Sequence, residues 1–225
     1  MPLIFLALIM IFIVPWLGLI LLAFFLFLFL LVPLGFAARS LAWLVVGPRE
    51  FVRVISDPLT RKNHALEHGT INVIEERGAG RLLTGESFKD GFAIRGIADP
   101  AYVLDAAREA RQRISAGDRA LTVNKRCGTT LVVINTISAV IFLLLLLIAG
   151  RISILAVILS VVAAYAIGPV ASPWVQRHIT TDPDFSSLEI SGVYLRPVRS
   201  VVPVMEVYVH TRVKGRAPDT EVVYQ

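Results

Sequence analysis

The chain begins with a long run of apolar residues and carries two more such runs in its second half. Residues 3–36 contain no charged side chain, and residues 131–149 and 152–171 are likewise uncharged. A helix needs roughly 20 apolar residues to cross the hydrocarbon core of a bilayer. Both later runs meet this length, and the two residues between them leave room only for a tight turn. The pattern predicts a membrane-spanning helical hairpin over residues 130–171.

The first apolar run exceeds one bilayer crossing, because a helix of this length rises about 50 Å. It forms either one long helix that starts outside the core or two segments broken near Pro15 and Gly18. We expect one principal span from about Trp16 to Phe36, with the preceding residues also in the membrane. The run has no basic leader and is too long for the apolar part of a signal peptide. Residues 1–37 are therefore taken as a membrane segment.

Polar and apolar residues mix between the first run and the hairpin, over residues 38–129. Residues 38–56 combine short apolar stretches with three arginines. They indicate either an interfacial segment or a continuation of the first span. Asp57 before Pro58 is typical of a helix start. A helix over residues 58–77 is therefore predicted, with a small α+β region around it.

Further elements follow from capping signals and from alternation of apolar residues. A second helix is expected over residues 101–116, after another Asp-Pro pair. Strands are expected before and after it, at residues 91–98 and 119–123. The tail, residues 172–225, adds alternating stretches at 187–195 and 204–213. These strands are expected to form one sheet with the middle of the chain.

Composition agrees with a membrane protein. Hydrophobic residues make up 56% of the chain and charged residues only 17%, with a mean hydropathy of +0.71. The predicted fold class is an α-helical integral membrane protein with about three spans, including a C-terminal helical hairpin, and a small cytoplasmic α+β portion. The lipid bilayer is its expected partner.

The distribution of basic residues sets the expected topology. Residues 38–129 carry 15 of the 22 Lys and Arg, and residues 172–225 carry six. Basic residues accumulate on the cytoplasmic side of short loops. Both regions are therefore expected in the cytoplasm, with the turn at Arg151 on the other side of the cell membrane. No stretch interleaves basic and aromatic residues, so nucleic acid is not an expected partner.

One short motif could carry chemistry. His64 and His68 lie four residues apart, with Glu67 directly before the second histidine. On a helix this spacing stacks both imidazoles on one face, close enough to bind one Zn²⁺. Glu67 would then lie near the metal as a general base, as in the HxxEH zinc peptidases.

A metal site needs a third ligand, and the sequence offers several. Cys127, the only cysteine, is the best by chemistry because it directly precedes the helical hairpin. The alternatives are Glu75, Glu76, His178, Asp182 and His210. The residues are equally consistent with a site that binds no metal. In that case the two histidines form hydrogen bonds to neighbouring carboxylates or lipid headgroups, and the cysteine is a small buried apolar residue.

Three segments in order resemble a known family. They read NHALEHGTINVIEE, NKRCGTTLVVI and WVQRHITTDPDFSSLEI, and they cover roughly residues 60–190. The chain resembles a bacterial family of multipass membrane proteins with a domain of unknown function, marked by HxxEHxT, CGT and TTxPD segments. Relatives carry a basic residue after the second histidine and a His-Pro pair before the cysteine, where this chain has Gly69 and Asn124-Lys125-Arg126.

The resemblance implies a set of site residues but no established activity. Carried over by position, the set is His64, Glu67, His68, Thr70, Cys127, Gly128, Thr129, Thr180, Thr181 and Asp182. The two ends of the hairpin must meet, which brings the cysteine segment near residues 180–182. We expect the oxygens of that segment to orient the imidazoles, although Thr and Asp before Pro are also common turn formers.

Two functions fit these residues. The first is an accessory, assembly or regulatory factor that binds a membrane-protein partner or another copy of itself, with a polar His/Glu/Cys site that functions with or without a metal. The second is a membrane-embedded zinc-dependent hydrolase or peptidase that uses the HxxEH motif.

Overall fold

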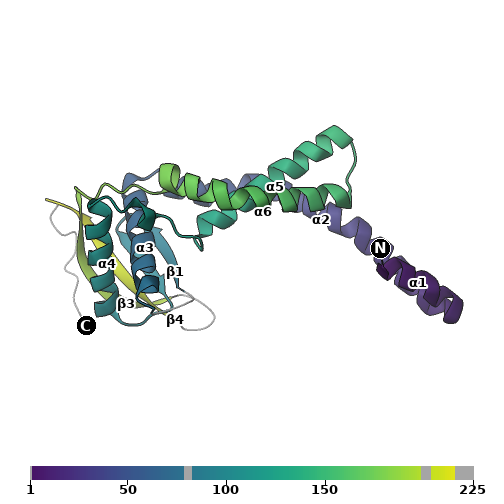
Figure 1. Ribbon diagram of the computed structural model, residues 1–225, viewed down its shortest axis with the longest axis horizontal. Coiled ribbons are helices and arrows are strands. Elements are labelled where there is room, and N and C mark those ends of the chain that lie inside the picture. Colours follow the sequence, from purple (N-terminus) through teal and green to yellow (C-terminus); the bar gives the residue numbers. More distant parts are fainter. Residues whose placement is uncertain (1, 79–82, 199–203, 216–225) are drawn as a thin grey trace. The chain divides into compact units, whose positions relative to one another are not determined.

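The computed structural model describes residues 2–78, 83–198 and 204–215 (Figure 1). The chain divides into two compact units, each described by itself. The helical unit comprises residues 1–47 and 134–167, and the sheet unit comprises residues 48–133 and 168–225.

The N-terminal apolar run breaks near Pro15 into a short and a long helix, and the long helix contains the principal span expected from about Trp16 to Phe36. Helix α1 covers Pro2–Ile13 and helix α2 covers Pro15–Ile55. The break coincides with Pro15, whose ring is accommodated at the first position of a helix. Gly18 then lets α2 lie directly against Ile11 of α1, where any Cβ would overlap the backbone. Residues 38–55, for which an interfacial segment was the other option, continue α2 without interruption.

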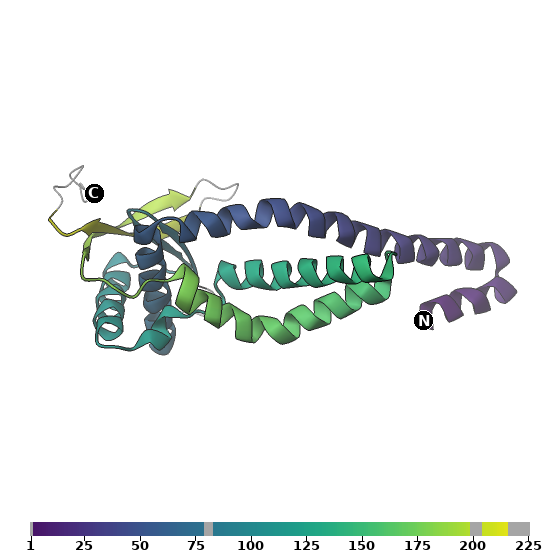
Figure 2. The same ribbon diagram turned by 90° about the horizontal axis from the view of Figure 1, so that it is seen from above.

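The predicted hairpin is present. Helices α5 (Gly128–Ala149) and α6 (Ile154–Val175) run antiparallel, as Figure 2 shows. Gly150 follows α5 with a φ of 62°, a conformation that favours glycine. Within the described residues, three helices are long and apolar enough to cross a membrane. They cover Pro15–Trp43, Gly128–Ala149 and Ile154–Thr180.

Polar contacts join α2 and α5 inside the helical unit. The Arg39 guanidinium donates to Asn135 at 3.3 Å, and the Trp43 indole donates to Thr136 at 3.1 Å. Below them, the rings of Phe36 and Phe142 meet edge to face. Arg39 thus has an amide rather than a carboxylate as its partner.

The sheet unit contains a four-stranded antiparallel sheet in the order β1-β2-β4-β3. The expected strands at 91–98, 187–195 and 204–213 are confirmed, and they do form one sheet. The sequence did not predict the first strand. The strands are β1 (Thr84–Phe88), β2 (Gly91–Arg95), β3 (Leu188–Val198) and β4 (Val204–Val213).

Helices α3 (Pro58–Glu76) and α4 (Pro100–Ser115) cover one face of this sheet (Figure 1). Both begin at the predicted Asp-Pro pairs, with the aspartate accepting backbone N–H bonds. Their buried sides join the sheet in one apolar core. The two helices approach closely at Gly69, where a side chain would overlap Ile114 of α4.

One expected strand is wrong. Residues 119–123 do not pair with the sheet; Arg119–Thr122 form a 3₁₀ turn, η1. The Thr122 hydroxyl closes the turn by donating to the carbonyl of Arg119 at 2.9 Å. Helix α3 binds this segment through Asn72, whose side-chain amide donates to the carbonyls of Leu121 and Val123.

Asn63 fixes α3 to the sheet and offers a stability test. Its fully buried amide donates to the carbonyls of Phe88 and Lys89 and accepts from the Thr211 hydroxyl. Asn63→Leu leaves these groups unpaired and should lower the free energy of unfolding by about 3 kcal/mol. Pulse proteolysis in urea, on the full chain in mild detergent, measures the change. Gln112→Leu, on the exposed side of α4, should stay within about 0.5 kcal/mol.

Candidate metal centre

The HxxEH motif lies on the buried side of α3. The side chains of His64, Glu67 and His68 are all buried, with relative exposures of 5%, 4% and 0%. The two rings are one helical turn apart, with centroids separated by 4.2 Å. A surface helix with solvated histidines is therefore excluded, and the residues need partners inside the protein.

Cys127 completes a cluster with the two histidines. His64 Nε2 lies 3.3 Å from Cys127 Sγ, and the ligand atoms of all three residues lie within 4.8 Å of one another. Tetrahedral Zn²⁺ with bonds of about 2.0–2.1 Å to nitrogen and 2.3 Å to sulfur sets ligand atoms ~3.3–3.6 Å apart. The cluster is therefore close to the size of a zinc site, and small side-chain shifts would close the difference.

A backbone carbonyl orients each imidazole. His64 Nδ1 donates to the carbonyl of Thr180 at 3.0 Å, and His68 Nδ1 donates to that of Thr122 at 2.8 Å. A carbonyl only accepts, so both Nδ1 atoms carry the proton. Both Nε2 atoms are thereby directed at the space beside the Cys127 sulfur. Metal-binding histidines are commonly fixed in this way.

The Nε2 atom of His68 is buried and has no hydrogen-bond partner among the described residues. Leaving a buried polar atom unpaired costs about 1–3 kcal/mol. His68 forms one cluster with Cys127 and His64, whose ligand atoms lie within 4.8 Å of one another. A cation held by all three residues would satisfy this Nε2 atom.

Two amide side chains hold the loops that carry these carbonyls. Asn72 donates to the carbonyls on both sides of Thr122, which presents the Thr122 carbonyl to His68. Gln176 accepts from the backbone N–H of Asn124 at 2.8 Å and donates back to its carbonyl at 3.1 Å. Gln176 begins a π turn, η2 (Gln176–Thr180), so it ties the Cys127 segment to the segment that orients His64.

The histidines determine the ionisation of Cys127. Burial alone would raise the pKa of this thiol, but the charges of His68 and His64 and the hydrogen bond with His64 outweigh it and lower the pKa to about 4. The backbone N–H of Thr129 also donates to the sulfur, at 3.3 Å. In the metal-free protein Cys127 is therefore a thiolate at neutral pH, which is the form that binds metals.

The opposite shift occurs at His64. Burial alone would lower the pKa of this imidazole, but the hydrogen bond with Cys127 and the charges of Glu67 and Cys127 raise it to about 9. Burial also raises the pKa of Glu67, partly opposed by the charges of His64 and His68. Without metal, the thiolate and the imidazolium thus neutralise each other inside the protein.

Strand β1 positions the Glu67 carboxylate. The Ser87 hydroxyl donates to one carboxylate oxygen. The other lies against Gly85, where any Cβ would overlap the carboxylate. Sequence reasoning missed both residues, because TGESF carries little of the alternation that marks a strand.

The structure places the remaining predicted residues unevenly. Thr180 contacts His64, although through its carbonyl rather than its hydroxyl. Thr70 donates within its own helix to Leu66, and Thr181 donates to the carbonyl of Gln176. The Asp182 carboxylate accepts from the N–H of Asp184. Of the oxygens of residues 180–182, that of Thr180 orients an imidazole, whereas the hydroxyl of Thr181 and the carboxylate of Asp182 bond within their own turn.

The alternative third ligands lie elsewhere. His178 is exposed and stacks on Trp174, and His210 bonds Ser191. Glu75 and Glu76 form ion pairs with Arg126 and Arg113. Within the described residues, only Cys127 joins the histidines in a group of metal-ligand atoms.

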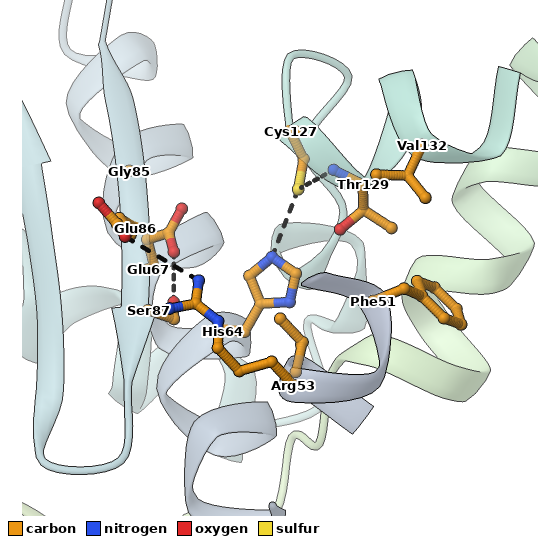
Figure 3. Close-up of a pocket in the computed structure, with 12 residues that line it drawn as sticks. Phe51, Arg53, His64, Glu67, Gly85, Glu86, Ser87, Cys127, Thr129 and Val132 are labelled. Atoms are coloured by element: carbon orange, nitrogen blue, oxygen red, sulfur yellow. Dashed lines mark hydrogen bonds and ion pairs between the residues drawn. The ribbon is translucent and has the colours of Figure 1, made fainter. Parts of the chain in front are cut away.

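A cavity of about 230 Å³ opens beside this cluster (Figure 3). His64, Glu67 and Cys127 all line it, so a metal held by the cluster would face open space. Strand β1 forms one wall, and the first residues of α5 form another. The remaining lining residues are Phe51, Arg53, Val54, Gly85, Glu86, Ser87, Gly128, Thr129 and Val132.

The lowered pKa of Cys127 predicts its reactivity in protein stripped of metal. Between pH 6 and 8, alkylation of an ordinary thiol of pKa 8.5 by iodoacetamide accelerates roughly 80-fold. Cys127 is already ionised at pH 6, so its rate should change less than about twofold. Mass spectrometry of the single cysteine measures the rate. In His64→Ala the alkylation rate should rise with pH, because the thiol loses a partner that lowers its pKa. A steep rise of the rate between pH 6 and 8 in wild type would show that Cys127 is not a thiolate at pH 6.

Comparison with known proteins finds a domain of unknown function, as the resemblance noted in the sequence implied. Residues 59–193 match the family model described as "Domain of unknown function (DUF6391)". An uncharacterised protein of Picosynechococcus sp. (strain ATCC 27264 / PCC 7002 / PR-6) is 31% identical over 143 residues, which cover 54% of this chain and 65% of that protein. No solved structure matches. The matched region spans more than half of the chain and contains the whole His/His/Cys cluster, and the chain therefore belongs to the family described as a domain of unknown function, DUF6391.

Proposed function

We propose that the protein is a zinc-dependent hydrolase, in which His64, His68 and Cys127 bind the metal and Glu67 is the general base. The observation that carries the proposal is the buried, unpaired Nε2 of His68, on a ring that clusters with the Cys127 sulfur and a second imidazole. Two imidazoles and one thiolate form a donor set that suits zinc. A bilayer-anchored chain of this kind would act on substrates close to the membrane surface.

The arrangement favours a catalytic site over a structural one. Structural zinc sites are usually closed by four protein ligands, whereas catalytic sites have three and keep one position open. The described residues supply three ligands, and the cavity lies on the open side. Glu67 lines the same cavity, which a purely structural cluster would not require.

Glu67 is suited to transferring a proton. Zinc bound here would acidify a water molecule and polarise a substrate carbonyl. Glu67 would take a proton from the water while the water oxygen bonds to the carbonyl carbon. The bond from that carbon to the leaving group then breaks, and Glu67 returns the proton to the leaving group. Because burial raises its pKa, the carboxyl holds the proton between the two steps.

The accessory role expected from the sequence stays a prediction, since no partner chain is present. It differs from the hydrolase in what Glu67 must do. An assembly factor would keep its partner whether Glu67 is ionisable or not, and a hydrolase would lose its activity.

Zinc content is the first test. Wild type, purified in detergent and supplied with zinc, should retain about one equivalent by elemental analysis. His68→Ala and Cys127→Ser should each lose most of it, because each removes one of three ligands. His178→Ala is the matched control and should keep its metal, since this ring is exposed and stacks on Trp174. Zinc well below one equivalent in wild type, or unchanged in His68→Ala, would refute the site.

Glu67→Gln separates metal binding from catalysis. The glutamine is isosteric and can still bond Ser87, so zinc content should not change. Hydrolysis of p-nitrophenyl acetate should fall at least about 100-fold, because a positioned base contributes about 10²–10⁴-fold. Glu75→Gln, at the Arg126 ion pair, serves as the control and should retain activity. Full activity in Glu67→Gln would exclude it as the base.

A further inference from the structure

Strand β1 lies at the edge of the sheet and beside the metal ligands. In the described part of the chain it pairs only with β2. Its first residues, Thr84 and Gly85, are exposed. In an antiparallel pair, alternate residues direct their N–H and C=O groups away from the partner strand. Such an edge can accept one more extended chain.

The same strand forms a wall of the catalytic cavity. Gly85, Glu86 and Ser87 line it together with His64 and Cys127 (Figure 3). At Gly85 the strand has no side chain, and the Glu67 carboxylate lies directly against its backbone. A chain that paired with β1 would therefore run past the general base and the ligand cluster.

The opposite wall is apolar. Phe51 and Val54 come from the end of α2, and Val132 comes from the first turns of α5. Arg53 and Glu86 form an ion pair across the same cavity, 3.9 Å apart. This wall suits an apolar side chain, and the ion pair suits a polar backbone entering beside it. Because α5 starts a candidate membrane span at Gly128, a substrate here would be close to the bilayer surface.

We propose that the substrate is a polypeptide that binds in extended form as an added strand on β1, with an apolar side chain against Phe51, Val54 and Val132. This rests on the proposed hydrolase function and names its substrate class. A row of backbone N–H and C=O groups is matched by another peptide backbone, whereas an acyl chain has no groups to pair with it.

The reaction is then peptide hydrolysis. Water supplies the oxygen that bonds to the peptide carbonyl carbon, and the C–N bond breaks. Glu67 carries one water proton to the leaving nitrogen, which departs as an amine, and the other product is a carboxylic acid. No oxidant or further reactant is needed.

The experiment uses the full chain in detergent, loaded with zinc, and a quenched fluorescent decapeptide with leucines at its centre. A set of analogues carries one N-methyl group at successive amides, each of which removes one N–H donor. N-methylation should raise KM at least tenfold at alternate positions only, because only alternate N–H groups would face β1. p-Nitrophenyl acetate, which has no peptide backbone, is the parallel substrate.

Filling the apolar wall gives an independent readout. Val132→Phe should raise KM for the leucine peptide at least fivefold relative to the same peptide with alanines. Zinc content checks that the variant folds. A preference unchanged by Val132→Phe would overturn the assignment of this wall.

The outcomes separate the two proposals. Cleavage of the peptide with the alternating N-methyl pattern supports strand addition to β1. Cleavage that is insensitive to N-methylation away from the cut bond overturns it, and leaves the hydrolase in place. Hydrolysis of the ester but not of any peptide overturns the substrate class alone. Hydrolysis of neither substrate by zinc-loaded protein overturns the proposed function and the inference with it.

Discussion

Each imidazole of the HxxEH helix is held by one backbone carbonyl, and neither carbonyl belongs to that helix. The partner of His68 lies on the 3₁₀ turn η1, and the partner of His64 lies at the end of the π turn η2. This pairing fixes both protons on Nδ1 and directs both Nε2 atoms toward Cys127. The rest of the site depends on it, because Asn72 and Gln176 position the two turns.

Burying two imidazoles, a thiol and a carboxyl together is costly unless each finds a partner. The fold supplies carbonyls for both Nδ1 atoms, Ser87 for Glu67, and mutual pairing for His64 and Cys127. One polar atom, the Nε2 of His68, is left over. The proposed zinc would give this remaining ligand atom its partner.

Local signals predicted a large part of the fold. The Asp-Pro pairs predicted both starts of α3 and α4, and alternation predicted β3 and β4. Two elements were missed because long-range contacts decide them. Strand β1 has weak strand propensity and exists because β2 pairs with it and α3 packs against it. Residues 119–123 alternate like a strand, yet Asn72 of α3 donates to the carbonyls of Leu121 and Val123. Arg119–Thr122 therefore form η1 instead.

The sequence by itself determined the spacing of the motif and the apolar runs, because helical periodicity and bilayer thickness act on neighbouring residues. It therefore placed His64, Glu67 and His68 on one helix and predicted the hairpin after Cys127. Only the tertiary structure decided which residue joins the two histidines and which backbone groups orient them. Cys127 lies 63 positions from His64, and Thr180 lies 116 positions away. Contacts over such separations depend on how the whole unit packs, which no local pattern specifies.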